Sequence, residues 1–455
     1  MDLPGSASDE EQIEDLFQIL ESIEQGLVHG DTEMLSDAGE KIDQVSASLS
    51  RRLTVPEVER TRLSAAVATL RGHLARWKQL PAEADDAYAE ALNLIEPSCL
   101  EPSVAARRAA SLWTYRGIGG LLDDSVEGLS SAVGHFDKAI ELRTRDGMGD
   151  SANRWGLAAA WMNRGDALGR IGGLLELEEK IRSNETAVSL LDDFPPDDNP
   201  AYRVRFALAQ MNRADAMLIL TTRYGKSFRA EVIAAFLTAV ETLRAGALRG
   251  EEESRRVLAV ALTNLARARL LMENRGSPLV EDAAREAMKL LSSGALDLLE
   301  GDLVTLELTA RLTLCRALGD RETPCQPEEV TDLVEEGLEL IRKFREKGGN
   351  LSALGGIASE LFRCGAESYL RNQPQFLADY LLDYLDPSSV HPVLADDIES
   401  HEIAVTTLWN GAAEIQRAGF SDIGSSGFDK NRDLLASWHE CRERLAAIRE
   451  ARIVY

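Results

Sequence analysis

Three asparagines recur at nearly constant spacing in this chain of 455 residues. Asn163 lies in "WMNRGDAL", Asn212 lies in "QMNRADAM" 49 residues later, and Asn264 lies in "LTNLARA" after a further 52. A side-chain amide both donates and accepts hydrogen bonds, so a ladder of amides can hold the backbone of an extended peptide whatever its side chains. Amides that recur in this way have the chemistry to hold a peptide backbone. The competing interpretation is that each amide caps a contact between helices.

Arginines gather in the same parts of the chain. Five segments together hold fifteen arginines, no lysine and three acidic residues, although the whole chain has a formal net charge of −26. A guanidinium binds a carboxylate or phosphate through two parallel hydrogen bonds and loses its hydration more easily than an ammonium. We predict that part of this set reads carboxylates of a partner; the alternative is that the arginines pair with acidic residues of neighbouring helices and hold repeats together. The segments are 103–120, 151–173, 201–219, 254–271 and 303–319, and the four assigned arginines are Arg108, Arg164, Arg205 and Arg213.

Helical periodicity sorts these arginines. Arg154, Arg203 and Arg255 each stand nine residues before an asparagine of the ladder, and at about 100° per residue that places them on the opposite side of a straight helix. Arg108 and Arg205 share the face of the asparagines. We therefore expect the first three to hold repeats together or to face solvent.

No spacing typical of catalysis is present. The six histidines form no HExxH, and GxxxxGK[ST], GxSxG and GxGxxG after a strand are all missing from the sequence. The nearest approach to a metal site is His391, Asp396, Asp397, Glu399 and His401, whose spacing matches no known set of ligands. Acidic residues at a helix start serve capping and the helix dipole instead. We predict a protein without enzymatic activity, without a cofactor and without a metal.

Composition limits the partners and the setting. A net charge of −26 disfavours general attraction to nucleic acids and anionic membranes. No run approaches the roughly 18 apolar residues of a membrane helix, and the start of the chain has no basic and apolar regions typical of a signal peptide. The five cysteines are isolated, as in proteins of a reducing compartment. We predict a cytoplasmic protein.

The elements that position these side chains are helices in pairs. A small residue recurs inside successive amphipathic patterns, at Gly72, Gly117, Gly165, Ala214 and Ala266. Each is followed by a second helical pattern with its own alanines. Where two antiparallel helices cross, a glycine or alanine lets their backbones approach closely. The unit of the chain is therefore predicted to be a helix–turn–helix hairpin.

The order of Trp, a small residue four positions later, and then Ala–x3–aromatic–x2–Ala and Pro resembles the tetratricopeptide repeat. The resemblance covers roughly residues 60–345; the unit at 72–97 fits closely, whereas the later period of 48 to 52 residues exceeds the family's about 34. It implies an all-α, right-handed solenoid of antiparallel helix hairpins whose first helices line a concave face. It also implies that Asn163, Asn212 and Asn264 contact the ligand backbone, with Tyr115 in the corresponding position one repeat earlier.

The pattern divides the chain into four segments. We predict a flexible tail at 1–10, an acidic helical cap at 11–56, tetratricopeptide-like repeats at 57–347, and a C-terminal helical repeat and capping region at 348–455. Solenoids need polar caps at their ends. The first forty residues hold twelve acidic residues and no Lys or Arg, which indicates either a solvated cap or a helix that competes for the arginine groove.

The resulting prediction is an interaction scaffold or adaptor that binds an extended or acidic peptide segment of a partner protein in its concave groove. One alternative is a regulatory subunit of an enzyme or signalling complex that docks through its caps. A second, less favoured, is a helical repeat that binds an anionic ligand or RNA. A protein partner is expected, a small molecule is not required, and membrane and nucleic-acid partners are disfavoured.

Overall fold

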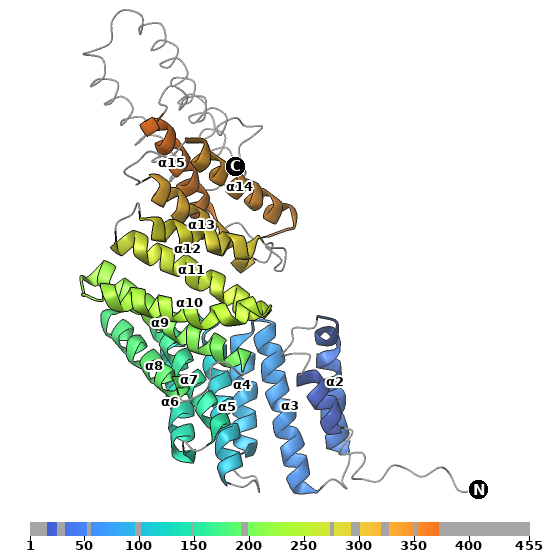
Figure 1. The fold of residues 1–455 in the computed structure, drawn as a ribbon. Helices are drawn as coiled ribbons and strands as arrows, with labels where there is room; N and C mark the ends of the chain where they lie inside the picture. The colour runs from blue at the N-terminus through green and yellow to red at the C-terminus, as the bar shows by residue number, and fades with distance from the viewer. Residues whose placement is uncertain are drawn as a thin grey trace, which may run out of the picture. The chain divides into compact units, whose positions relative to one another are not determined.

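The described part of the chain folds as a series of helices (Figure 1). The computed structural model describes residues 16–24, 32–51, 56–95, 102–147, 150–192, 199–273, 277–292, 301–319, 327–349 and 354–372. The predicted tail at 1–10 and the cluster from His391 to His401 lie outside the described residues. Within the described ranges every regular element is a helix, which confirms the predicted all-α fold.

The chain divides into two compact units, Met1–Phe228 and Arg229–Tyr455. The boundary falls between two helices that the sequence pattern assigns to one hairpin. The first unit holds α2 (Thr32–Arg51), α3 (Glu57–Trp77), α4 (Pro81–Ile95), α5 (Pro102–Gly120), α6 (Val126–Asp146), α7 (Ser151–Ile171), α8 (Leu174–Asp192) and α9 (Pro200–Tyr224). The second holds α10 (Arg229–Leu248), α11 (Glu252–Met272), α12 (Pro278–Leu291), α13 (Gly301–Gly319), α14 (Pro327–Glu346) and α15 (Gly355–Asn372).

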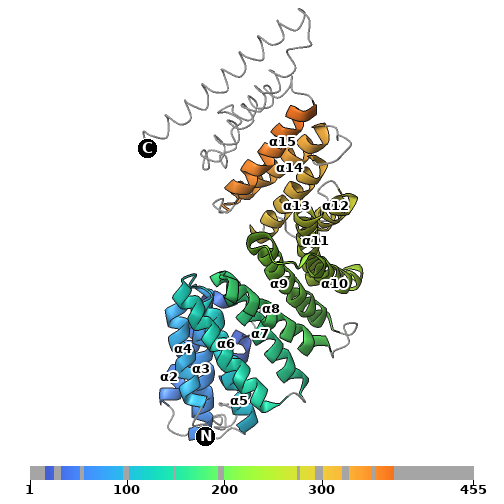
Figure 2. The same cartoon turned by 90° about the vertical axis from the view of Figure 1, so that its left-hand side faces the viewer.

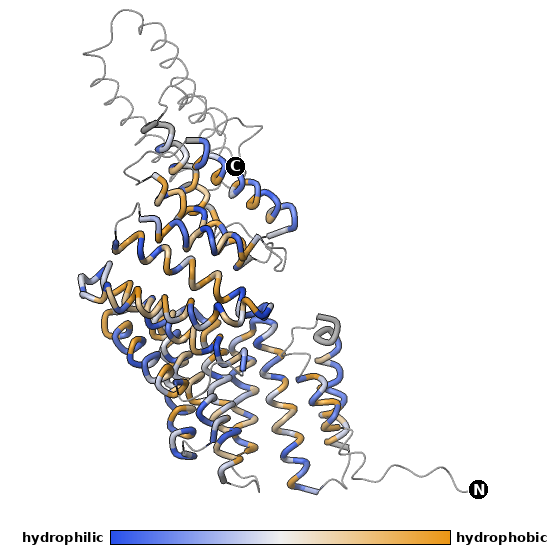
Figure 3. The backbone as a smooth tube through the Cα atoms, in the orientation of Figure 1, coloured by the Kyte–Doolittle hydropathy of each residue, from blue (hydrophilic) through white to orange (hydrophobic). Residues whose placement is uncertain are grey.

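Consecutive helices pack against one another in each unit. In the first unit α3 pairs with α4, α5 with α6, and α7 with α8, as the tetratricopeptide-like pattern predicts. The helices alternate hydrophobic and hydrophilic residues along their length (Figure 3), and each buries its apolar side against its neighbours. Such an array gains its stability from contacts between adjacent hairpins rather than from one central core.

The recurring small residues lie where the two helices of a hairpin approach most closely. A Cβ added to Gly117 would lie 2.5 Å from the ring of Phe136, and one added to Gly165 would lie 2.6 Å from Nδ2 of Asn184. Gly72 stands in the same way against the ring of Tyr88. At Gly72 and Gly117 a larger residue would overlap an aromatic ring, so the ring or the second helix would have to move.

The first unit curves so that its first helices lie on the inside. α5 contacts α7, and α7 contacts α9, more extensively than α4 contacts α6 or α6 contacts α8. When one layer of a stack is closer together than the other, the closer layer lies on the concave side. The helices α5 to α9 of this unit can be followed by their labels in Figure 2, which is turned by 90° from Figure 1. The helices that carry the predicted ladder therefore form the inner layer of the first unit, and the surface of this layer is its inner face.

The cap region begins with a helix at 16–24. Leu16, Leu20 and Ile23 are buried and pack with α2 and α3 in one hydrophobic cluster that includes Ile42 and Val67. The same helix carries Glu21 and Glu24, which are exposed. Within the described helix at 16–24 the buried side is thus apolar, and the two glutamates are exposed.

Candidate functional site

The two asparagines of the first unit lie on neighbouring inner helices. Asn163 is on α7 and Asn212 is on α9; both side chains are half-buried. Within the part of the chain that the structure describes, neither amide makes a hydrogen bond, so each retains its donor and its acceptor for a ligand or for water. Asn264, on α11, is also half-buried, but it belongs to the second unit. The site in the first unit therefore contains two asparagines.

Tyr115 occupies the ladder position on α5 and packs into an aromatic cluster. Its ring lies 4.5 Å from that of His73 in an edge contact and 5.8 Å from that of Tyr88 in a stacked one. His73 Nδ1 and the Tyr88 hydroxyl are 2.8 Å apart. Burial raises the pKa of Tyr115, and the negative charge of Glu24 adds to the rise. The side chain of Tyr115 is thus held by aromatic packing on α5, and it does not take the role of the asparagine amides on the later helices.

Two of the four predicted arginines bind carboxylates of the second helices. Arg164 Nε donates to Asp137 Oδ1 of α6 at 2.8 Å, and its Nη1 donates to Ser183 Oγ of α8 at 2.9 Å. Arg213 Nε donates to Glu185 Oε1 of α8 at 3.1 Å. For Arg164 and Arg213 the structure therefore matches the alternative interpretation, in which arginines hold repeats together.

Arg205 differs from both. Its guanidinium lies over the Trp155 ring, 3.7 Å from the centroid, and its Nη1 donates to the Trp155 carbonyl at 3.4 Å. Trp155 in turn packs against Tyr202, with ring centroids 5.8 Å apart. No carboxylate of the described residues lies within ion-pair distance, and burial lowers the pKa of Arg205 to about 10. This guanidinium is fixed in place and partly desolvated, yet its charge is not compensated.

Arg108, on α5, is exposed and likewise has no carboxylate partner among the described residues. It lines an open cavity of about 540 Å³ between the helix at 16–24, α3 and α5. The floor of this cavity is apolar and includes Leu70 and Leu112, while Glu21 and Glu24 stand on the wall formed by the cap helix. An acidic wall and an arginine wall therefore share one cavity at the cap end of the inner face.

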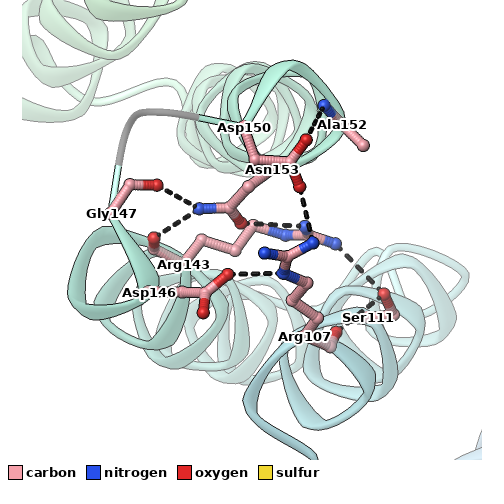
Figure 4. A network of polar contacts seen from close by, with 8 residues as sticks. All are labelled: Arg107, Ser111, Arg143, Asp146, Gly147, Asp150, Ala152 and Asn153. Carbon is pink, nitrogen blue, oxygen red and sulfur yellow. Dashed lines mark hydrogen bonds and ion pairs between the residues drawn. The ribbon is translucent and has the colours of Figure 1, made fainter. Parts of the chain in front are cut away.

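The sequence analysis did not identify one further guanidinium on this face. Arg143, at the end of α6, reaches between α5 and α7, where its Nη2 donates to Ser111 Oγ at 3.0 Å and its Nη1 to Asn153 Oδ1 at 3.4 Å (Figure 4). Its Nε is buried without an acceptor, and burial lowers the pKa of Arg143. The corresponding feature in the sequence is Gly156. The Arg143 guanidinium lies where a side chain at this position would be, because a Cβ added to Gly156 would overlap it.

The acidic residues near Arg143 are already engaged. Arg107 donates to Asp146 and to Asp150, each at 2.5 Å, and so bridges α5 to the last residue of α6 and to the residue before α7 (Figure 4). Asn153 Nδ2 donates to the carbonyl oxygens of Arg143 and Gly147, both at 2.8 Å. This network fixes the end of α6 against α5 and α7. It leaves Arg143 without an ion pair, although Asp146 attracts its charge at longer range.

In the described ranges, no three His, Cys, Asp or Glu side chains come close enough to hold a metal ion. No described helix has the length and apolar character of a membrane span. What the inner face of the first unit presents is two unengaged amides and three guanidinium groups without carboxylates. Such groups bind a peptide backbone and anionic side chains.

No family model matches the chain, and no curated protein matches it in sequence. Among solved structures, the apo form of RapI is similar at 10% identity and a TM-score of 0.45, with 96% of this chain and 97% of that chain covered. The apo form of the quorum sensor NprR from B. thuringiensis is similar at 11% and 0.46, covering 93% and 99%. Aspartyl phosphate phosphatase F from Bacillus subtilis is similar at 12% and 0.35, covering 99% and 96%.

Proposed function

We propose that the first unit binds an extended peptide segment of a partner protein on the inner face of α5, α7 and α9, and that the protein acts as an interaction scaffold or adaptor. The observation that carries the proposal is the pair Asn163 and Asn212. Both amides are half-buried, lie on adjacent inner helices and have no hydrogen bond within the described residues. A half-buried amide without a partner in the protein keeps its donor and its acceptor for a ligand or for water, so this pair is available to a peptide backbone.

Peptide binding is tested by panning random dodecapeptides displayed on phage against the full-length protein. The best selected peptide is then synthesised with a fluorescent label and titrated by fluorescence anisotropy. We expect Asn163→Ala together with Asn212→Ala to weaken binding about tenfold or more, because each lost backbone hydrogen bond contributes about 0.5–1.5 kcal/mol. Asn93→Ala is the matched control, since Asn93 is exposed on α4. Equal affinity of the double variant and the control would contradict the proposal.

The acidic wall of the cavity gives a second expectation. Glu21 and Glu24 face the same cavity as Arg108 and repel a negatively charged peptide. Replacing both by Gln should raise the affinity for an acidic peptide about two- to fivefold, the range of an exposed charge interaction. The gain should vanish at about 1 M salt, where the Debye length falls to about 3 Å. Glu90→Gln with Glu127→Gln, both exposed and remote from the cavity, should change nothing; a gain that persists at high salt would rule out an electrostatic origin.

A further inference from the structure

We propose that the cavity between the cap helix at 16–24, α3 and α5 holds the N-terminal residue of the peptide, with an apolar side chain on the cavity floor and the free ammonium group at the carboxylates of Glu21 and Glu24. The inference rests on the proposed peptide-binding function and specifies which end of the ligand lies at α5. The peptide would then run from α5 towards Asn163 on α7 and Asn212 on α9.

The cavity has the size and the lining of a site for a small group. Its volume is about 540 Å³, within the range of about 300–1,000 Å³ that is usual for ligand pockets. The floor includes Leu70, Ile95 and Leu112, whose side chains are buried in the fold. An apolar side chain that covers this floor is removed from water, which favours binding. The floor therefore selects a residue with a sizeable apolar side chain.

Two of the three arginines that line the cavity have carboxylate partners of their own. Arg62 Nη1 donates to both carboxylate oxygens of Glu59, at 2.9 and 3.1 Å, and its guanidinium lies over the Phe17 ring, 5.5 Å from the centroid. Arg107 donates to two aspartates, as described above (Figure 4). Both positive charges are thus compensated by residues other than those of the acidic wall.

The acidic wall is formed by Glu21 and Glu24 of the cap helix. Both are exposed and line the cavity, and neither has an ion pair within the part of the chain that the structure describes. Glu24 lies close enough to Tyr115 of α5 for its negative charge to raise the pKa of the phenol. Two carboxylates and a phenol oxygen therefore border one space, and each can accept a hydrogen bond from an ammonium group.

Exposed carboxylates without an ion pair also occur elsewhere on the first unit, as at Glu127 on α6. The pair on the cap helix differs because it borders an apolar floor in the same cavity. A charge next to an apolar floor matches a ligand in which an ammonium group and an apolar side chain are close together. The first residue of a peptide has this chemistry, because its α-amino group and its side chain are attached to the same carbon atom.

The acidic wall also decides between the two ends of a peptide. A C-terminal carboxylate would be repelled by Glu21 and Glu24, whereas an N-terminal ammonium group is attracted to both. Capture of an N-terminal amine is a recurrent mode of peptide recognition. An internal residue of a peptide would require the chain to continue past the cap helix, which forms one wall of the cavity. An N-terminal residue needs no such path.

Three small amides test the cavity without a peptide. Phenylalaninamide has both the apolar side chain and the ammonium group, N-acetylphenylalaninamide lacks the charge, and glycinamide lacks the side chain. Ligand-observed NMR titrations with the full-length protein at low ionic strength should give at least about tenfold tighter binding of phenylalaninamide than of either other amide, a difference of about 1.4 kcal/mol. Equal affinity for phenylalaninamide and its acetylated form would overturn the inference.

Substitutions test whether the cavity is the place of binding. Glu21→Gln with Glu24→Gln removes both charges at constant size, and should weaken binding of phenylalaninamide about tenfold without changing that of the acetylated form. Glu90→Gln with Glu127→Gln removes an equal charge from exposed positions on α4 and α6 and should change neither affinity. Equal effects of the two double variants would show that the net charge of the protein attracts the amine, and the inference would be wrong.

The same comparison applies to a dodecapeptide selected from a library displayed with free N-termini and labelled at its C-terminus. Acetylation of its N-terminus should weaken binding to the unsubstituted protein about tenfold. In Glu21→Gln with Glu24→Gln, acetylation should have no effect. For an acidic peptide with an acetylated N-terminus, these two substitutions should instead raise the affinity, as expected above, because only the repulsion of its carboxylates remains.

The outcomes separate this inference from the proposed function. If the selected peptide depends on Asn163 and Asn212 but acetylation leaves its affinity unchanged, the cavity does not hold its N-terminus; the inference is then wrong and the peptide-binding function stands. If no peptide is selected and phenylalaninamide binds no better than its acetylated form, both are wrong.

Discussion

Phe136→Ala is expected to lower the free energy of unfolding of the first unit by about 3–5 kcal/mol, the usual cost of removing a fully buried phenylalanine ring. Phe136 is 0% exposed and its ring fills the space above Gly117. Chemical denaturation followed by circular dichroism measures the change. Trp77→Ala is the control, since Trp77 is 48% exposed and its removal leaves no cavity.

A second substitution decides whether the Gly117–Phe136 contact is the cause. Gly117→Ala alone should destabilise, because its Cβ would lie 2.5 Å from the ring. In the Phe136→Ala background the same methyl group enters the vacated space and should cost nothing or stabilise. Additive effects of the two substitutions would contradict this packing account, because residues in direct contact show coupling energies of about 0.5–3 kcal/mol.

Acidification from pH 7 to pH 5 is expected to remove about 2 kcal/mol of stability through His73 alone. Burial, with a smaller contribution from Arg76, lowers the pKa of His73 in the folded chain to about 4, below its unfolded value of about 6.5. A lowered histidine pKa means that the unfolded chain binds the proton more readily. The contribution is therefore fully present above pH 6.5 and is lost as the pH falls towards 4.

Denaturant unfolding at both pH values tests this expectation. In His73→Gln the difference between pH 7 and pH 5 should shrink by about 2 kcal/mol relative to the unsubstituted chain. His135→Gln is the matched comparison, because burial also lowers the pKa of His135 but Asp85 opposes the shift. It should reduce the pH dependence less. An undiminished difference in His73→Gln would show that another group carries the acid sensitivity.

The helices and their pairing could be predicted because they depend on local patterns. The recurring small residues mark the crossings, and the structure places Gly72, Gly117 and Gly165 against Tyr88, Phe136 and Asn184 of the following helix. The predicted first helices match α5, α7, α9, α11 and α13 to within a few residues at their ends. The division of the chain after Phe228 was not predicted, because the repeat pattern continues through it without a linker.

The roles of individual arginines could not be predicted in the same way. Arg164 and Arg205 have similar surroundings in the sequence, because each lies on a first helix among small and apolar residues. Their difference lies in what the second helices present, Asp137 to Arg164 and no carboxylate to Arg205. Ion pairs between residues 27 or more positions apart depend on the tertiary packing of the hairpins. Arg143 was missed for the same reason, because it enters the inner face from a second helix.

The connection of each hairpin only to its neighbours has a thermodynamic consequence. In such arrays the free energy of unfolding is close to a sum over repeats and their interfaces, so the ends can open while the middle stays folded. A peptide lying across α5, α7 and α9 would link three hairpins at once and would bind only when all three are folded together. Saturating ligand should then merge partial openings into one transition, which native-state hydrogen exchange would register as equal protection along the three helices.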